Sequence, residues 1–544
     1  MRAPVTAPDP ASVPAHVTGT RHLLRLILRR DRIRLPVWLL GLGGIIAASA
    51  LAVPPVYDTA KKVAGYASAV GTSPVSYLMS GRQAGIDTIG GIVANEISQV
   101  AQLGICLMVM FLVVRHTRAE EETGRAELLR STVLGRHAAT LAGLLYGVFA
   151  AVLIGAITTG AMLATGLEPV GSMTYGVGLG LLGLCYVAVS LVAAQLATSA
   201  RGALGLAGAA IAIGYLVRGV GAMRDNALVW ASPFGWAQRM DAFGAERWWP
   251  ALLLVALTAA LLGLAAVLAA HRDFGGGLLQ ARPGRPDASR LLGTPVGLAL
   301  RLQRGLLIGW AVGLSALGLL YGAVIPTIPD LVASNPDIAQ AIGASANAEQ
   351  ALINAFLRYI FLFMAVILTG FVVSSVLRLR AEEEAGRAEM VLATPLARTS
   401  WVVATVLVTC LGALLLTLLM GMGLAVGYGL GMGRWDRLAG QLGGQLSYLP
   451  GVLVVAAVAV AIAGLLPRWS VLAWAVVAFV FLQVLLGETL RLPDWVDAIS
   501  PFWHLPGLPV ETFEPTPAVA QLILAAALMM LGLWGYARRD LPAG

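Results

Sequence analysis

One acidic, glycine-interrupted segment occurs twice in this chain, as RAEEETGRAELL at residues 118–129 and as RAEEEAGRAEMV at residues 380–391. The similarity continues further, because 12 of 19 positions are identical between residues 118–136 and residues 380–398. We call residues 118–136 the first cassette and residues 380–398 the second cassette. Each cassette follows a long apolar stretch. The pattern therefore predicts an internal duplication with one cassette in each half.

The composition indicates a membrane protein. Of the 544 residues, 58% are apolar and 12% are charged, whereas soluble domains carry about 25% charged residues. Twelve apolar segments approach the ~20 residues that a helix needs to cross a bilayer. These segments are residues 35–53, 97–114, 138–164, 173–199, 202–217, 250–270, 305–325, 359–377, 400–427, 446–466, 469–487 and 517–537. The sequence predicts an all-α polytopic membrane protein with twelve transmembrane helices.

Two further echoes divide the twelve helices into parallel halves of six. LRRDRIRLPVW at 28–38 resembles LRLQRGLLIGW at 300–310, and SPFGW at 232–236 resembles SPFWH at 500–504. Parallel repeats are a transporter architecture. The predicted organisation is a cytoplasmic tail with an amphipathic surface helix (1–34), a first six-helix transmembrane unit (35–270), a cytoplasmic linker (271–304), a second six-helix transmembrane unit (305–537) and a cytoplasmic C-terminus (538–544).

The positions of the basic residues predict the orientation. With the N-terminus inside, the cytoplasmic segments hold 26 of the 37 basic residues, as the positive-inside rule requires. Both termini and both cassettes are then cytoplasmic. The net charge of +8 is explained by this bias, so we predict no nucleic-acid partner.

The sequence contains no motif for metal binding, for a disulfide framework or for ATP binding. Cys106, Cys185 and Cys410 lie in separate apolar segments, which gives neither a disulfide framework nor a metal-ligand spacing. The only lysines, Lys61 and Lys62, are not part of a GxxxxGK[ST] phosphate-binding loop. We therefore expect no catalytic residue, no metal site and no cofactor on this chain.

Energy coupling inside the membrane is not predicted either. The twelve predicted spans contain no Asp, Glu, Lys or Arg, whereas ion-coupled carriers keep ionisable groups at membrane depth. Ionisable residues such as Arg218 lie at outer span ends, where headgroups or water can solvate them. The energy must then enter through the cassettes, where Gly124 or Gly386 can adopt a positive φ and reverse the chain. The alternative for each cassette is a solvated turn that anchors the membrane surface.

The residues of the second cassette also predict its local structure. A short helix after Gly386 would lie parallel to the membrane, with Met390 and the next residue filling a pocket while Glu389 stays exposed. Thr394 is placed to cap the following helix, with Pro395 at its first position.

The pattern EEExGRAExxxxTPLxR resembles the cytoplasmic coupling segment of ABC-2-type exporter permeases, and two such units in one chain resemble the actinobacterial exporters of polyketide antibiotics and multidrug efflux permeases. The resemblance implies that each cassette docks on a nucleotide-binding subunit. The residues that carry it are Glu120, Glu121, Glu122, Gly124, Arg125, Glu127 and Leu128, and Glu382, Glu383, Glu384, Gly386, Arg387, Glu389, Thr394 and Pro395. The family also has an amphipathic helix before the first span, which residues 21–34 fit; the alternative is a membrane-surface anchor.

The resemblance implies the permease subunit of an ATP-driven exporter of lipophilic or amphipathic drugs in the bacterial cytoplasmic membrane. Two copies of a partner ATPase would bind the ATP and Mg. Polar residues that could line the substrate pathway are Asn95, Glu96, Gln99, Gln102, Asn354 and Arg358; the alternative is that they form interfacial or interhelical hydrogen bonds. Residues 218–248 and 488–516 are expected to hold short broken helices at the outer gate.

Two other functions stay open on the sequence. A secondary drug carrier of the major facilitator type also has six-plus-six parallel repeats, but its repeated motif is basic rather than glutamate-rich. A polytopic membrane enzyme, such as a lipid-linked sugar transferase, would need a set of acidic residues in an outer loop. Asp494, Asp497, Glu511 and Glu514 form no recognisable set of this kind.

Overall fold

The chain is described here by a computed structural model that covers residues 17–71, 74–124, 134–272, 276–278, 287–325, 348–490 and 493–539. It forms two compact units, residues 1–283 and 284–544, and the boundary between them lies inside the predicted linker. All regular structure within the described ranges is helical. Each unit is described by itself.

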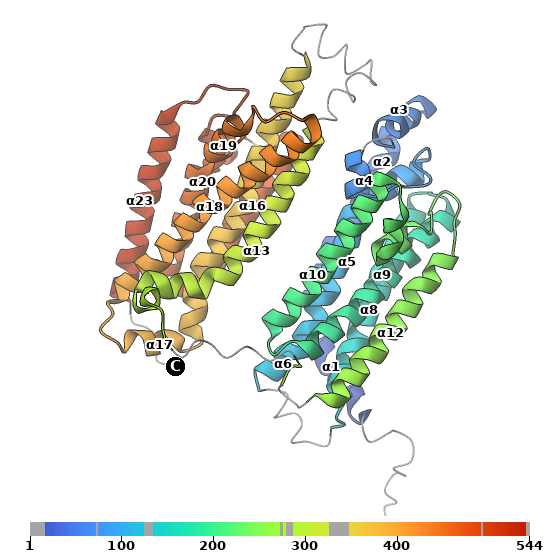
Figure 1. Ribbon diagram of the computed structural model, residues 1–544, viewed down its shortest axis with the longest axis horizontal. Helices are drawn as coiled ribbons and strands as arrows, with labels where there is room; N and C mark the ends of the chain where they lie inside the picture. The colour runs from blue at the N-terminus through green and yellow to red at the C-terminus, as the bar shows by residue number, and fades with distance from the viewer. Residues whose placement is uncertain are drawn as a thin grey trace, which may run out of the picture. The chain divides into compact units, whose positions relative to one another are not determined.

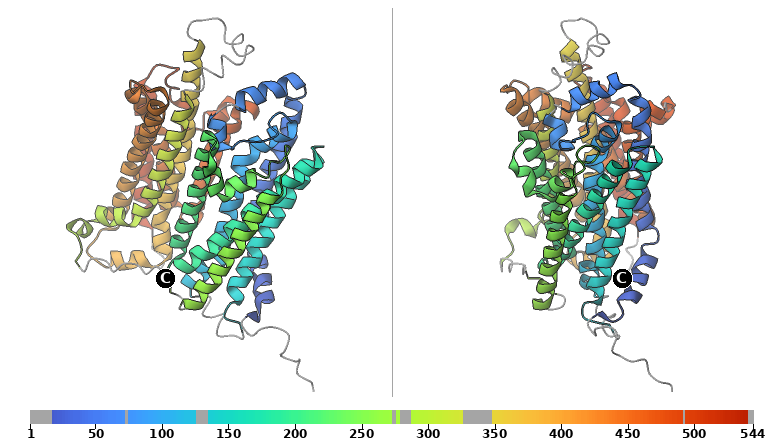
Figure 2. Two further views of the ribbon diagram at one scale, coloured as in Figure 1. Left: turned by 45° about the vertical axis from the view of Figure 1, so that its right-hand side comes forward. Right: turned by 90° about the vertical axis from the view of Figure 1, so that its right-hand side faces the viewer.

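Long apolar helices dominate the first unit and run side by side in it (Figures 1 and 2). They are α2 (Arg34–Val56), α5 (Ile89–His116), α8 (Ala138–Ala164), α9 (Pro169–Leu196), α10 (Ala200–Arg224) and α12 (Trp249–His271). The amphipathic α1 (Thr20–Arg30) precedes them, and α6 (Arg118–Glu122) follows α5. The shorter elements are α3 (Ala60–Val70), α4 (Pro74–Met79), η3 (Ala227–Ala231) and α11 (Pro233–Gln238).

The second unit repeats this plan. Its long helices are α13 (Pro295–Val324), α16 (Ala348–Glu384), α18 (Arg398–Met432), α20 (Leu449–Leu465), α21 (Ala473–Leu490) and α23 (Pro515–Arg538). The shorter elements are η4 (Arg290–Gly293), α17 (Arg387–Leu392), α19 (Leu438–Leu446), η6 (Pro467–Leu472), α22 (Asp494–Asp497) and η7 (Pro501–His504). The described part of the chain holds 12 helical segments long and apolar enough to cross a membrane. The predicted all-α polytopic membrane protein is confirmed.

The core of each unit lies around its second and fourth long helices. In the first unit these are α5 and α9, and in the second they are α16 and α20, whose apolar windows are mostly buried. The outer long helices, such as α12, expose apolar side chains such as Leu252, as expected of surfaces that face lipid. In the second unit α13 and α18 approach closely at Gly423 and Gly427. A Cβ added at Gly427 would lie 2.1 Å from the carbonyl oxygen of Leu319, so only glycine permits this contact.

The amphipathic helix and the short helices between the fifth and sixth spans occur where they were predicted. In α1 the residues Leu23 and Ile27 are buried on one face, while the arginines of the same helix are exposed. The expected short helices between the fifth and sixth spans are η3 and α11 in the first unit, and α22 and η7 in the second.

Candidate functional site

The first cassette begins where α5 ends. The helical conformation is interrupted at Thr117, and the short helix α6 follows. Gly124 then adopts a φ of +71°. Arg125, Glu127 and Leu128 lie outside the described residues. The positive φ predicted at Gly124 is confirmed. A Cβ at this position would meet nothing within 4 Å, so glycine is required here for its backbone conformation alone.

Each described glutamate of the first cassette is bound within its own unit. The Glu121 carboxylate accepts hydrogen bonds from Arg272 at 2.6 and 2.8 Å and from Arg118 at 2.7 Å. Glu120 forms an ion pair with Arg30 of α1 at 2.6 Å. Glu122 accepts a hydrogen bond from the backbone N–H of Ala200, at the start of α10, at 2.8 Å. The acidic run therefore joins the end of α5 to α1, α10 and the segment after α12.

The three consecutive glutamates of the second cassette are also bound within their own unit. Glu383, whose side chain is 2% exposed, pairs with Arg380 at 3.0 Å and also with Arg539. Glu384 pairs with Arg380 at 3.2 Å. Glu382 accepts a hydrogen bond from Arg387 at 2.6 Å, and this bond raises the pKa of the Arg387 guanidinium. Gly386 has a φ of +68°, which confirms the chain reversal predicted there.

One arrangement of three side chains is thus repeated in the two units. Arg118, Glu121 and Arg272 form it in the first unit, and Arg380, Glu383 and Arg539 form it in the second. In both units, the arginine that follows the sixth long helix also donates to a carbonyl of the fourth long helix. Arg272 donates to Ala194 at 3.4 Å, and Arg539 donates to Ala463 at 3.2 Å. We call each set an Arg–Glu–Arg clamp. It fastens a cassette to the cytoplasmic ends predicted for the fourth and sixth spans.

Sequence reasoning missed Arg272 and Arg539. A signal was present, because each arginine precedes an aspartate directly after the sixth apolar segment of its half, in HRD at 271–273 and RRD at 538–540. A repeated charged pair at equivalent positions of a duplicated chain marks a shared contact.

Two predictions for the second cassette are wrong in detail. Met390 does not fill a pocket, because its side chain is 68% exposed. The buried residue of α17 is Ala388, and residues two positions apart point in nearly opposite directions on a helix. Thr394 does not cap the next helix, since α18 begins only at Arg398. Its hydroxyl instead donates to the carbonyl of Val391 at 2.6 Å, and Pro395 lies in the bend between α17 and α18.

The exposed face of the second cassette is mixed in character. Glu384, Arg387, Glu389 and Met390 are among the residues exposed on it, and α17 runs crosswise to the end of α16 (Figure 1). The prediction that Glu389 is exposed is confirmed. These residues belong to the part of the cassette that a partner could contact without breaking the clamp.

The candidate pathway residues of the first unit lie on one face of α5. The Asn95 side chain is 5% exposed and donates to the hydroxyl of Tyr66 at 2.8 Å, and the same hydroxyl donates to the more exposed Glu96. Gln99 is half-buried. Gln102 is 4% exposed, and its Oε1 has no hydrogen-bond partner among the described residues. Asn95 borders a cavity of about 240 Å³, and Gln102 borders a small one of about 10 Å³.

The candidate pathway residues of the second unit are paired with their neighbours. Asn354 accepts a hydrogen bond from Gln350 at 2.8 Å, and Arg358 forms an ion pair with Glu511 at 3.2 Å. Counting back from Arg118 and Arg380, the positions of α16 that correspond to Asn95 and Gln102 are Leu357 and Met364, which are both buried. The buried polar face is therefore a property of α5.

The prediction that Arg218 is solvated is wrong. Its side chain is 0% exposed, because α4 and the residues after it cover this part of α10. The guanidinium donates to the carbonyl of Met79 at 2.9 Å and stacks on the ring of Tyr215 at 4.2 Å. A sequence pass could not detect α4 as a cover, since its six residues read as part of an outer loop.

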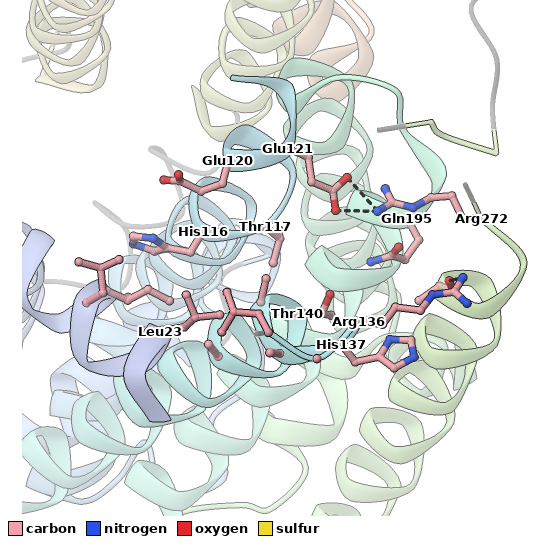
Figure 3. Close-up of a pocket in the computed structure, with 18 of the residues that line it drawn as sticks. Leu23, His116, Thr117, Glu120, Glu121, Arg136, His137, Thr140, Gln195 and Arg272 are labelled. Carbon is pink, nitrogen blue, oxygen red and sulfur yellow. Dashed lines mark hydrogen bonds and ion pairs between the residues drawn. The ribbon is translucent and has the colours of Figure 1, made fainter. Parts of the chain in front are cut away.

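A cavity of about 360 Å³ lies beside the first clamp (Figure 3). Glu121 and Arg272 of the clamp form part of its wall, together with His116, Gln195 and Arg136. The wall also includes apolar residues of α1 and α8. Sequence reasoning did not predict this cavity.

The comparisons with known proteins agree with this architecture. A family model described as the C-terminal domain of the multidrug efflux system permease Rv1217c matches residues 292–537. Over 535 residues the chain is 37% identical to the multidrug efflux system permease protein Rv1217c of Mycobacterium tuberculosis, a match that covers 96% of this chain and 95% of that protein. This chain belongs to the Rv1217c permease family. Membership in the Rv1217c family confirms the resemblance to actinobacterial multidrug exporter permeases, and it does not favour a carrier of the major facilitator type.

Proposed function

We propose that this member of the Rv1217c family is the membrane subunit of an ATP-driven exporter of lipophilic or amphipathic drugs in the bacterial cytoplasmic membrane, with both termini in the cytoplasm. Two copies of a separate nucleotide-binding subunit would dock on the two cassettes and supply the ATP and Mg. The observation that carries the proposal is the Arg–Glu–Arg clamp, which occurs in both units at the point where a cassette meets the ends of the transmembrane helices.

The clamp explains how a force on a cassette would reach the membrane. In the second unit, Glu383 is held between Arg380 of α16 and Arg539 after α23. Both arginines are less than one-fifth exposed, and charge-assisted hydrogen bonds are strong when water is excluded. Displacement of α17 by a partner would therefore move the ends of two spans together. A solvated turn that only anchors the surface has no need of this connection.

The docking contacts would be made by the exposed residues of the cassettes rather than by the clamped glutamates. In the second cassette these include Glu384, Glu389 and Met390. An exposed methionine flanked by carboxylates suits a partner that offers an apolar pocket with a basic rim. Glu383 keeps its internal bonds in this arrangement, so it acts by positioning the cassette.

The test is co-expression of the full chain with the candidate ATPase. We expect the purified chain alone to hydrolyse no ATP, and drug-stimulated hydrolysis to appear only with the ATPase bound. Met390→Asp and Glu389→Lys should each weaken recovery of the ATPase in a pull-down. Trp534→Ala, on the exposed face of α23, is the matched control and should leave recovery unchanged. Drug export by the lone chain in energised, ATP-depleted vesicles would contradict the proposal and support a carrier.

A further inference from the structure

The cavity beside the first clamp has an apolar wall and a polar wall. Leu23, Leu26 and Ile27 of α1 form the apolar wall together with Ala138 and Ala142 of α8. The polar wall carries Glu121 and Arg272 of the clamp and the residues around them (Figure 3). α1 is amphipathic, and Leu26 on it is 42% exposed. Such a helix lies at the boundary between headgroups and acyl chains, so the cavity opens where a membrane lipid can reach it.

Cations outnumber carboxylates at the polar wall. Arg30 is paired with Glu120, and Arg272 shares Glu121 with Arg118. Arg136 is exposed, and among the described residues its guanidinium bonds only to carbonyl oxygens, those of Ala269 and Ala270 at 3.5 and 3.3 Å. A carbonyl oxygen carries no full charge, so it does not neutralise a guanidinium. The planar guanidinium group matches the geometry of a phosphate. The rim of the cavity therefore favours an anionic group.

Two buried polar atoms on the wall have no hydrogen-bond partner among the described residues. They are Oε1 of Gln195, whose residue is 2% exposed, and Nδ1 of His116, whose residue is 3% exposed. Nε2 of His116 lies 2.6 Å from Asp31. If Nε2 carries the proton toward this carboxylate, Nδ1 is an acceptor. Unsatisfied acceptors on side chains that line a cavity favour a ligand that donates, and hydroxyl groups do so.

The second unit has no comparable cavity at the corresponding position among its described residues. The corresponding residues of the two units are identified by aligning the two clamps. Arg272 and Arg539 correspond, so the residues three positions earlier, Ala269 and Tyr536, correspond as well. Ala269 borders the cavity of about 360 Å³, whereas the buried Tyr536 borders a space of about 10 Å³.

A second substitution between the units has the same effect. Ala194 and Ala463 accept from the two clamp arginines, so Gln195 corresponds to Gly464 in the second unit. A Cβ added at Gly464 would lie 2.1 Å from the carbonyl oxygen of Gly532. Close helix packing therefore occupies the space that the first unit leaves open. The cavity is not a general consequence of the fold.

We propose that this cavity binds a membrane phospholipid whose phosphodiester carries a hydroxyl-bearing headgroup, of the glycerol or inositol kind. The phosphate would lie at Arg136, the hydroxyls would donate to Gln195 and His116, and an acyl chain would lie against α1. Because Glu121 and Arg272 of the first clamp line the cavity, a bound lipid would stabilise the junction between the first cassette and α12. The inference uses only the membrane location and does not depend on the proposed export function.

The test uses the full chain purified in detergent and exposed to equal amounts of phosphatidylglycerol, phosphatidylinositol and phosphatidylcholine, with bound lipid counted by native mass spectrometry. We expect one retained phosphatidylglycerol or phosphatidylinositol per chain, held at least tenfold better than phosphatidylcholine, which has no hydroxyl on its headgroup. Ala269→Tyr, which copies the second unit, should lower retention at least tenfold. Arg136→Gln, at an exposed position, should lower it without risk to the fold.

Matched substitutions in the second unit serve as controls. Arg398 is the cassette residue that corresponds to Arg136, and Arg398→Gln should leave lipid retention unchanged. Equal retention of phosphatidylcholine, or undiminished retention in both Ala269→Tyr and Arg136→Gln, would overturn the proposal. Competition by millimolar glycerol phosphate as effective as that of the lipid would also overturn it, since the site would then belong to a soluble phosphoester.

Discussion

Asp31 and His116 are joined by a hydrogen bond in the first unit, with Oδ2 and Nε2 2.6 Å apart and both side chains at most 1% exposed. Tyr146 donates a second hydrogen bond to the same carboxylate oxygen at 3.1 Å. The pair joins the corner between α1 and α2 to the end of α5, two residues before the first cassette. In the sequence echo before the first span of each half, Gln303 stands at the position of Asp31. It is 1% exposed and accepts a hydrogen bond from Ser375 at 2.6 Å.

The two units therefore fix the same junction with different chemistry, and their sensitivity to substitution should differ. Asp31→Ala leaves His116 and Tyr146 without their hydrogen-bond partner and also removes the ion pair between Asp31 and Arg115 at 3.4 Å. Breaking a buried ion pair typically costs about 3–5 kcal/mol. Gln303→Ala should cost about 1–2 kcal/mol, because Ser375 keeps its hydrogen bond to Thr409 at 2.6 Å. Thermal unfolding of the purified variants measures the difference. Asp58→Ala, in an exposed pair with Lys62, is the control that should change little. Equal losses for Asp31 and Gln303 would contradict this account.

Removal of Arg539, the clamp arginine that follows the last span, should uncouple the second cassette from that span. In Arg539→Gln, Glu383 keeps Arg380 but loses its bond to the segment after α23. Charge-assisted hydrogen bonds contribute about 1.5–3 kcal/mol, so we expect about a tenfold or larger fall in drug-stimulated ATP hydrolysis by the complex. Hydrogen exchange of the backbone around 380–390 should become faster. Arg538→Gln is the matched control, since the neighbouring Arg538 is exposed and stacks on Trp534 at 4.3 Å.

The glycine of the second cassette should tolerate asparagine better than alanine. Gly386 has a φ of +68° with no atom within 4 Å of an added Cβ, so the penalty comes from the backbone alone. A non-glycine residue in this conformation costs about 1–2 kcal/mol, and asparagine less. Coupled hydrolysis should therefore fall in Gly386→Val and Gly386→Ala and largely return in Gly386→Asn. Gly263→Ala tests general tolerance, because it lies within α12 with open space around it. Identical activity of the Ala and Asn variants would rule out a role for the positive φ.

Gln102 should matter for transport more than for stability. Its Oε1 has no hydrogen-bond partner among the described residues, so Gln102→Met, which copies Met364 of the second unit, should leave thermal stability unchanged or raise it. If α5 lines the pathway, export of hydrogen-bonding drugs should fall several-fold. Gln238→Met removes a bond to the Ser80 carbonyl and should instead lower stability, by about 1–3 kcal/mol. A fall in stability with normal export in Gln102→Met would assign Gln102 to the core.

Labelling from one side of the membrane tests the predicted parallel orientation. Thr123→Cys and Ala385→Cys lie at exposed positions next to the two reversing glycines and should both react only from the cytoplasm. Lys62→Cys and Trp248→Cys, also at exposed positions, should react only from outside. Reaction of residues 123 and 385 from opposite sides would exclude parallel repeats.

The sequence by itself determined the membrane class, the approximate positions of the spans and the reversing glycines. Each of these depends on local properties. A span is recognised from about 20 consecutive apolar residues, and the conformation at Gly124 and Gly386 follows from what one residue type permits. The internal duplication was equally visible, because it is a comparison of letters.

Only the tertiary structure decided which groups meet. The cassette glutamates looked available to a partner, yet Glu121 and Glu383 are held by Arg272 and Arg539, more than 150 residues away in sequence. An ion pair depends on which helix ends pack together, and apolar composition does not encode that choice. The burial of Arg218 is decided by the cover that α4 provides. The difference between an open and a closed cavity depends in part on Ala269 and Tyr536, because the volume of one side chain has consequences only after its neighbours are in place.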